Sequence, residues 1–110
     1  MLLPTTITPR HPCIPTKPAH LERKAEAAGR ILRAISNPRR LILLHYMAER
    51  EMSVNQLAQA VGLSQSATSQ HLSTLQKEEL VARRRAGQTV YYSLASERVR
   101  KLLNSLLVMV

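Results

Sequence analysis

Aromatic residues are nearly absent from this sequence, which contains no Trp, no Phe and only Tyr46, Tyr91 and Tyr92. Proteins that bind single-stranded nucleic acid stack bases on aromatic rings, so this shortage disfavours a single-strand binder. The one cysteine, Cys13, cannot form an internal disulfide, which favours a reducing compartment such as the cytoplasm. The longest apolar run, Leu106 to Val110, is far shorter than the roughly 20 residues of a membrane span, so we expect no membrane partner.

Motifs that identify enzymes and metal proteins are missing as well. The sequence has no His-Glu-x-x-His, no Gly-rich phosphate loop and no pair of carboxylates spaced for acid–base catalysis. His11, Cys13 and His20 match no standard zinc spacing. We therefore expect no catalytic residues, no metal site and no cofactor, and no small-molecule ligand is evident.

The charge balance is strongly basic, because 16 Lys and Arg residues against 7 Asp and Glu give a formal net charge of +9. This excess favours a polyanionic partner, either nucleic acid or an anionic membrane surface. The membrane alternative lacks support because no segment has the pattern of a basic amphipathic helix. A chain of 110 residues, 45% of them hydrophobic, forms one domain with a modest core, so dimerisation would help to bury apolar surface.

Residues 1–19 differ in composition from the rest of the chain because they hold five of its six prolines. Proline interrupts helices and sheets, so we predict a disordered or extended Pro-rich N-terminal arm. Contact of this arm with phosphates through Arg10 and Lys17 is a weaker alternative. Residues 20–110 then form the folded domain.

Two short helices separated by a glycine form the centre of this domain. Ser53 and Gln56 have the spacing of a capping box, which begins a helix, and Gly62 can adopt the left-handed conformation that ends one. Ser64 is a second N-cap, and neither Gly nor Pro interrupts the helix expected over Ser64–Glu78. Such a tight pair is typical of a helix-turn-helix, whose second helix enters the major groove of DNA.

The outer face of the second helix carries Gln and Ser side chains at helical spacing, without charge. A solvated helix face usually carries Lys and Glu, whereas Gln can bond bidentately to adenine and Ser can bond to several base edges. A Ser- and Gln-rich exposed helix without a partner is the plainer alternative. The DNA-binding residues that we predict on and before this helix are Ser53, Ser64, Gln65, Ser66, Thr68, Ser69, Gln70 and Ser73.

After Leu80 the pattern changes from a helical to a strand period. Val81–Arg85 and Gln88–Ser93 are predicted strands, with Ala86-Gly87 as the turn between them. Three consecutive arginines on such a hairpin could be a solvated charge run, but beside a DNA-reading helix phosphate or minor-groove contact is the better interpretation. The DNA-binding residues that we predict here are Arg83, Arg84, Arg85 and Gln88.

The flanking helices carry the remaining apolar stripes. The first is expected over His20–Ser36 and the last from about Ser96 to the end of the chain. Their apolar residues are too many for exposed terminal helices, so we predict a two-fold dimer interface. The expected interface residues are Leu21, Ala25, Ala28, Leu32, Val99, Leu102, Leu103, Leu106 and Val110. His45, on a helix expected from Pro38 to about Arg50, is predicted to pack in the core.

These motifs resemble the ArsR/SmtB family in order and spacing. The matching segments are Ser53 to Ala58, Gly62 to Leu72, Leu80-Val81, Arg83-Arg84 and Gly87 to Tyr92. The chain looks most like the NolR/HlyU-like branch, because the family's metal-binding Cys pair would fall within Ser53 to Gln59, where no Cys is present. The Asp and His metal ligands that the family usually carries on its last helix are also missing, between Ser96 and Val110. Some members of the branch have a redox cysteine where His45 stands, so thiol sensing is not expected.

The resemblance implies a mainly α fold with a small β-hairpin, a winged helix-turn-helix of about five helices and a two-stranded wing. It implies a homodimer that binds double-stranded DNA at an inverted-repeat operator and represses transcription, in the cytoplasm and at operators on the bacterial nucleoid. A winged-helix protein-interaction module that has lost DNA reading is the alternative.

Overall fold

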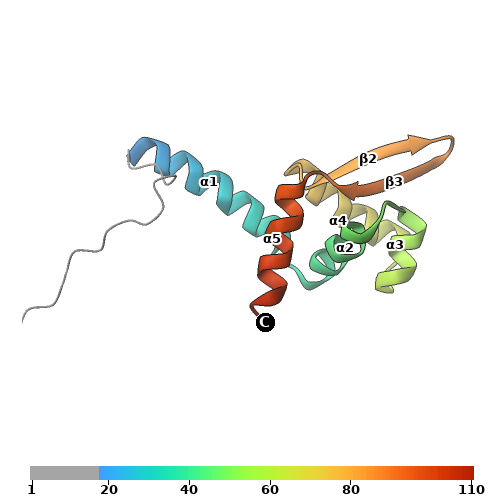
Figure 1. The fold of residues 1–110 in the computed structure, drawn as a ribbon. Coiled ribbons are helices and arrows are strands. Elements are labelled where there is room, and N and C mark those ends of the chain that lie inside the picture. Colours follow the sequence, from blue (N-terminus) through green and yellow to red (C-terminus); the bar gives the residue numbers. More distant parts are fainter. Residues whose placement is uncertain (1–17) are drawn as a thin grey trace, which may run out of the picture.

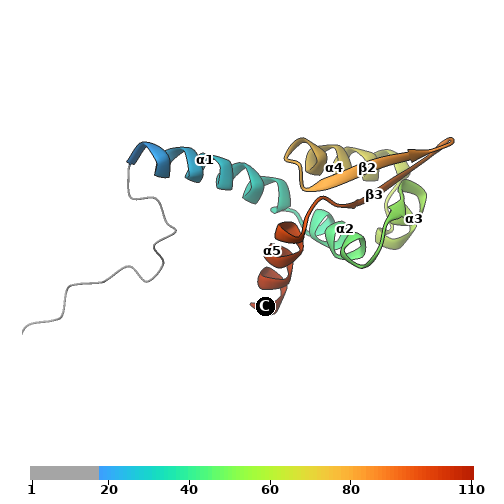
Figure 2. The ribbon, with the colours of Figure 1, turned by 45° about the horizontal axis from the view of Figure 1, so that its top comes forward.

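The computed structural model describes residues 18–110, in which five helices accompany one three-stranded antiparallel sheet (Figure 1). The long first helix and the hairpin of the last two strands extend from opposite ends of the body formed by the other elements (Figures 1 and 2). In chain order the elements are α1 (Pro18–Ile35), α2 (Pro38–Glu49), β1 (Met52–Ser53), α3 (Val54–Val61), α4 (Gln65–Lys77), β2 (Val81–Ala86), β3 (Thr89–Leu94) and α5 (Glu97–Val108).

Side-chain caps set where the helices begin. Asn37 Oδ1 accepts from the backbone N–H groups of Arg39 and Arg40 at 2.9 and 3.2 Å, which starts α2 with Pro38 in its first turn. The capping box predicted at Ser53 and Gln56 is present and starts α3. Ser64 and Ser96 cap α4 and α5 with one hydrogen bond each, accepted from the backbone N–H groups of Ala67 and Val99.

The first helix begins earlier than predicted, at Pro18 instead of His20. Proline is tolerated in a first helical turn because the N–H that it lacks would have no partner there. Pro18 and Ala19, assigned above to the arm, therefore belong to α1. The predictions on Arg10, His11, Cys13 and Lys17 lie outside the described residues.

Left-handed residues end the two helices of the central pair. Gly62 adopts φ +71° after α3, and the N–H groups of Gly62 and Leu63 donate to the carbonyl of Ala58. After α4 the same role falls to Glu79, with φ +58°. Its N–H donates to the Gln76 carbonyl and that of Leu80 to the Leu75 carbonyl, the two bonds of a Schellman motif.

The two strands predicted for the wing form the β2–β3 hairpin, and the sheet has a third strand that was not predicted. Residues Met52 and Ser53 form β1, which pairs with Tyr92 and Tyr91 of β3, and the strand order is β1-β3-β2. Two residues are too short to produce a strand period in the sequence. The hairpin turn is also displaced by one residue, to Gly87-Gln88, and Gly87 has the positive φ (+64°) that a two-residue loop needs.

The core of the protomer draws on every helix. Leu43, Leu44 and Met47 of α2 pack with Leu57 of α3 and with Leu72 and Leu75 of α4, all of them buried. Val99 and Leu103 of α5 belong to the same cluster, with 9% and 3% of their surface exposed. Their assignment to a dimer interface was therefore wrong, because one side of the apolar stripe on α5 is used within the protomer.

Several apolar side chains of α1 and of the C-terminal end of the chain remain on the surface. Leu21 and Leu32 of α1 are 49% and 54% exposed, Leu107 of α5 is 40% exposed, and Val110 is fully exposed. His45 is exposed as well, 3.7 Å from Glu49, so its predicted place in the core was wrong. Among residues 18–110 no helix combines the length and apolarity that a membrane crossing requires.

Candidate nucleic-acid interface

The two sides of α4 differ sharply in exposure. Leu72 and Leu75 face the core, while the neutral polar side is open to solvent. Nothing within the described protomer covers that side, so its amide and hydroxyl groups are available to an incoming partner. The exposed residues of this side are Gln65, Ser66, Ser69, Gln70 and Ser73.

Thr68 does not belong to this surface. Its side chain is fully buried, and its hydroxyl donates to the Ser64 carbonyl at 2.9 Å. The prediction that Thr68 contacts DNA was therefore wrong. Helical spacing places it with Leu72 and Leu75 on the inner side, where a back-bonded hydroxyl can be buried without an unsatisfied donor.

A hollow of about 450 Å³ lies between the N-terminal ends of α3 and α4 and the tip of the wing. The residues that line it include five that the sequence predicted, Ser53, Gln65, Ser66, Ser69 and Gln88. They also include Asn55, which the sequence analysis did not predict. Thr89 and the partly buried apolar residues Val54 and Val90 complete the lining. Asn55 is the second residue after the Ser53 cap, so its position in the first turn of α3 was the available signal.

Two serine caps, Ser53 in the lining of this hollow and Ser64 directly before Gln65 of the lining, each keep a hydroxyl proton that can be donated. Ser53 Oγ accepts from the Gln56 N–H at 3.1 Å, and Ser64 Oγ accepts from the Ala67 N–H at 3.0 Å. A hydroxyl that accepts can still donate its proton to another oxygen. Helix N-termini also favour anions through their unpaired N–H groups and dipole. The arrangement can hold a phosphate group of a DNA strand.

The strand register divides the three wing arginines between two faces. Arg83 lies opposite Tyr92 and Arg85 opposite Val90, on the face that continues the core, whereas Arg84 lies opposite Tyr91 on the outer face. Arg85 Nε donates to the Gly87 carbonyl at 3.3 Å. All three arginines are exposed, as is Gln88 at the turn.

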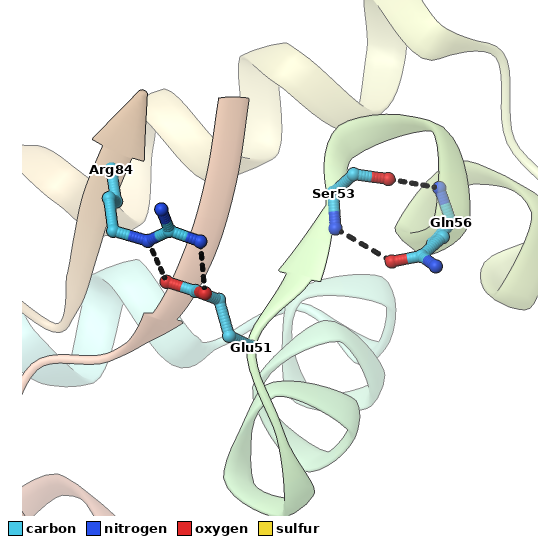
Figure 3. Close-up of polar contacts among 4 residues, drawn as sticks. All are labelled: Glu51, Ser53, Gln56 and Arg84. Atoms are coloured by element: carbon cyan, nitrogen blue, oxygen red, sulfur yellow. Dashed lines mark hydrogen bonds and ion pairs between the residues drawn. The ribbon is translucent and has the colours of Figure 1, made fainter. Parts of the chain in front are cut away.

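Arg84 is engaged within the protomer. Its Nη2 and Nε donate to the two carboxylate oxygens of Glu51 at 2.7 and 3.0 Å (Figure 3), and its guanidinium lies 4.8 Å from the centre of the Tyr91 ring. The hydrogen bonds from Arg84, aided by its charge, lower the pKa of the Glu51 carboxyl. Sequence reasoning missed Glu51 because 33 residues separate it from Arg84.

Comparison with known proteins identifies the fold and its function class. Residues 37–83 match the model of the bacterial regulatory proteins of the arsR family. Nodulation protein NolR of Rhizobium meliloti is 48% identical over 89 residues, covering 81% of this chain and 73% of that protein. Transcriptional activator HlyU of Vibrio cholerae is 40% identical over 86 residues, covering 78% and 80%. The chain belongs to the ArsR family.

Solved structures of ArsR-family proteins share the architecture. NolR from Sinorhizobium fredii superposes with a TM-score of 0.75 at 48% identity, over 84% of this chain and 91% of that one. A homodimeric winged helix-turn-helix DNA-binding domain from Mycobacterium bovis gives 0.78 at 29% identity, over 86% and 88%. These matches confirm the predicted winged helix-turn-helix and the prediction of a transcription regulator that is not an enzyme.

Metal ligands of the wider ArsR family are not assembled in the described part of the chain. Among residues 18–110 no group of three or more His, Cys, Asp or Glu side chains lies close enough to hold a metal ion. His45 lies at the surface beside Tyr46, and His71 is held by Arg40, so these two histidines of the domain have protein contacts of their own. The lack of a metal switch remains a prediction.

Proposed function

We propose that this ArsR-family chain is a homodimeric repressor that binds double-stranded DNA at an inverted-repeat operator. The observation that carries the proposal is the exposed, neutral polar side of α4 next to an arginine-bearing wing. Exposed amides and hydroxyls on the second helix of a helix-turn-helix have the chemistry of base readout in the major groove.

Each protomer would bind one half-site. Gln65, Ser66, Ser69 and Gln70 enter the major groove, with Ser73 further along the helix. The hollow between α4 and the wing receives the adjoining phosphates, which Ser53 approaches from the N-terminus of α3, while Ser64 lies at the N-terminus of α4 next to Gln65 of the lining. Arg83, Arg85 and Gln88 then follow the backbone into the flanking groove, where two positive charges add affinity without reading sequence.

The exposed part of α1 supports the dimer. Only the C-terminal end of α1, at Ala34 and Ile35, is buried against the protomer, and the remainder extends away from it (Figure 2). An isolated helix with exposed leucines is marginal in water unless it packs against a partner. We expect the interface to join α1 and the part of α5 that the core leaves accessible, from two copies. The residues are Leu21, Ala25, Ala28, Leu32, Leu102, Leu106 and Val110, of which Leu102 and Leu106 also pack partly against the protomer's own core.

A two-fold axis at that interface relates the two α4 helices, so it requires an inverted repeat. Successive major grooves on one side of B-DNA are about 34–36 Å apart, and the two half-sites should have that spacing. A dimer covering this length at a promoter would block access of RNA polymerase. Among the relatives, HlyU of Vibrio cholerae is named an activator and a Xylella fastidiosa protein a biofilm growth-associated repressor.

Selection of bound duplexes from a random pool tests the proposal directly. We expect enrichment of an inverted repeat whose half-site centres are about 10–10.5 base pairs apart, or a multiple of that spacing. Enrichment of a direct repeat would contradict the proposed dimer geometry. No enrichment at all, with only salt-sensitive binding to every duplex, would contradict sequence-specific reading and favour a protein-interaction module.

A further inference from the structure

The contact between Arg84 and Glu51 connects parts of the sheet that do not pair with each other. In the order β1-β3-β2, Arg84 belongs to one outer strand and Glu51 directly precedes the other. Their side chains meet across the central strand, where Tyr91 lies under the guanidinium at 4.8 Å. The ion pair thus spans all three strands on the outer face of the sheet, as Figure 3 shows for Arg84 and Glu51.

Glu51 also lies next to the start of the helix-turn-helix. Ser53, two residues later, pairs with Tyr91 in the sheet and caps α3, whose capping box appears beside Glu51 in Figure 3. A displacement of Glu51 would therefore be transmitted to the N-terminus of α3. On the other side, Arg84 belongs to the strand that leads to the wing tip, where Gln88 and Thr89 line the hollow.

We propose that Arg84 and Glu51 form a wing anchor, a positioning pair that holds the hairpin at a fixed angle to α3 and α4. Arg84 then makes no phosphate contact, in contrast to Arg83 and Arg85. The effect of the wing anchor on DNA binding rests on the proposed function, whereas the anchor itself does not. It replaces the prediction that all three arginines bind DNA.

Two physical features support an anchor over a phosphate contact. A bidentate pair between guanidinium and carboxylate fixes orientation as well as distance, and the Tyr91 ring adds a cation–π contact. A two-stranded hairpin is only marginally stable by itself, and beyond Val81 every residue of β2 is exposed. A contact of this kind in the middle of β2, two residues before the strand ends at Ala86, helps to hold the wing tip in one orientation toward DNA.

Exchange of the charges separates the two roles. Arg84→Glu and Glu51→Arg each place like charges together, while the double variant Glu51→Arg with Arg84→Glu restores an ion pair at unchanged net charge. Hydrogen exchange of the hairpin amides, measured without DNA, should be at least tenfold faster in each single variant and return to within about threefold of the wild type in the double variant. Glu51→Gln, which keeps the shape and loses the charge, should also accelerate exchange.

Titration of the selected duplex over a range of salt concentrations gives the second readout. The double variant should recover the wild-type affinity and salt slope, whereas the control Arg85→Gln should lower the slope by about 0.9, the value for one phosphate contact. A double variant as weak as Arg84→Glu, or hairpin exchange that is unchanged in Glu51→Gln, would overturn the anchor. If the wild type bound no duplex, the proposed function would fail, but the exchange measurement would still decide the anchor.

Discussion

His71 lies on α4, with its side chain turned toward α2. Its Nδ1 accepts from Arg40 Nε at 3.1 Å, and Arg40 also donates to the carbonyl of Ala34 at the end of α1, at 2.9 Å. One guanidinium therefore joins α4 to the helix that we assign to the dimer interface. Burial and, after it, the positive charge of Arg40 lower the pKa of His71.

The lowered pKa of His71 makes the stability of the protein depend on pH in a defined direction. The unfolded chain binds a proton at residue 71 more readily than the folded protein does, so acid favours unfolding. The contribution of His71 is complete above its unfolded pKa of about 6.5 and is lost as the pH falls below that value. In His71→Asn, whose Oδ1 can accept from Arg40, the free energy of unfolding should change less between pH 7.5 and 5.5 than in the wild type. Denaturant unfolding at both pH values measures it, and equal changes would contradict this account of His71.

At the scale of elements, the end of α4 carries strain that a single substitution should relieve. Glu79 adopts φ +58°, a left-handed conformation that costs a non-glycine residue about 1–2 kcal/mol. Glu79→Gly removes that cost but gives the unfolded chain more freedom, which offsets about 0.4–1 kcal/mol. We expect a net stabilisation of up to about 1 kcal/mol, observed as a melting temperature several degrees higher.

Gly62 supplies the matched control for that prediction. A Cβ built on Gly62 meets no atom within 4 Å, so the effect of a substitution there comes from its φ of +71° alone. Gly62→Ala should destabilise by about 1 kcal/mol, while Gly62→Asn should cost less because Asn tolerates the left-handed region. We expect Glu79→Gly to raise the free energy of unfolding and Gly62→Ala to lower it. Changes in the same direction would show that backbone conformation does not control these helix ends.

Elements whose ends depend on neighbouring residues could be predicted from the sequence. The caps at Asn37, Ser53 and Ser64 act within three residues, so helix starts followed from local spacing. Strand β1 could not be predicted, because its two residues become a strand only by pairing with β3, about 40 positions later. Glu51, the partner of Arg84, could not be predicted for the same reason, because the two residues are far apart in the sequence. Apolar spacing on α5 showed a stripe but not which residues face the protomer's own core, so Val99 and Leu103 were misassigned.

At the scale of the whole molecule, the dimer interface should be tested on α1 instead of at Leu103. Leu103 is 3% exposed, so a charge there would unfold the protomer, whereas Leu32 is 54% exposed and its replacement leaves the protomer core intact. Leu32→Glu removes two leucines from each dimer, at about 1.5–3 kcal/mol apiece. The dimer dissociation constant should rise at least about 100-fold, since 1.4 kcal/mol corresponds to a factor of ten.

Sedimentation analysis measures whether Leu32→Glu dimerises, and circular dichroism shows whether the variant is folded. Leu32→Glu should give a folded monomer with much weaker affinity for the operator, although the residue is remote from the DNA-binding surface. Gln76→Glu, which adds the same charge at an exposed position near the end of α4, should remain dimeric. A Leu32→Glu variant that stays dimeric at the same concentrations would exclude α1 from the interface.

The claim that the exposed side of α4 reads base sequence is tested most directly at Gln70. Gln70→Ala removes an amide that can bond bidentately to adenine, and the exposed position of the residue makes a folding defect unexpected. The measurement is the affinity of wild type and variant for the selected duplex and for a shuffled duplex of equal length, at one salt concentration. We expect the variant to lose about 1–3 kcal/mol on the selected duplex and much less on the shuffled one. An equal loss on both duplexes, or no loss on either, would show that Gln70 does not read sequence.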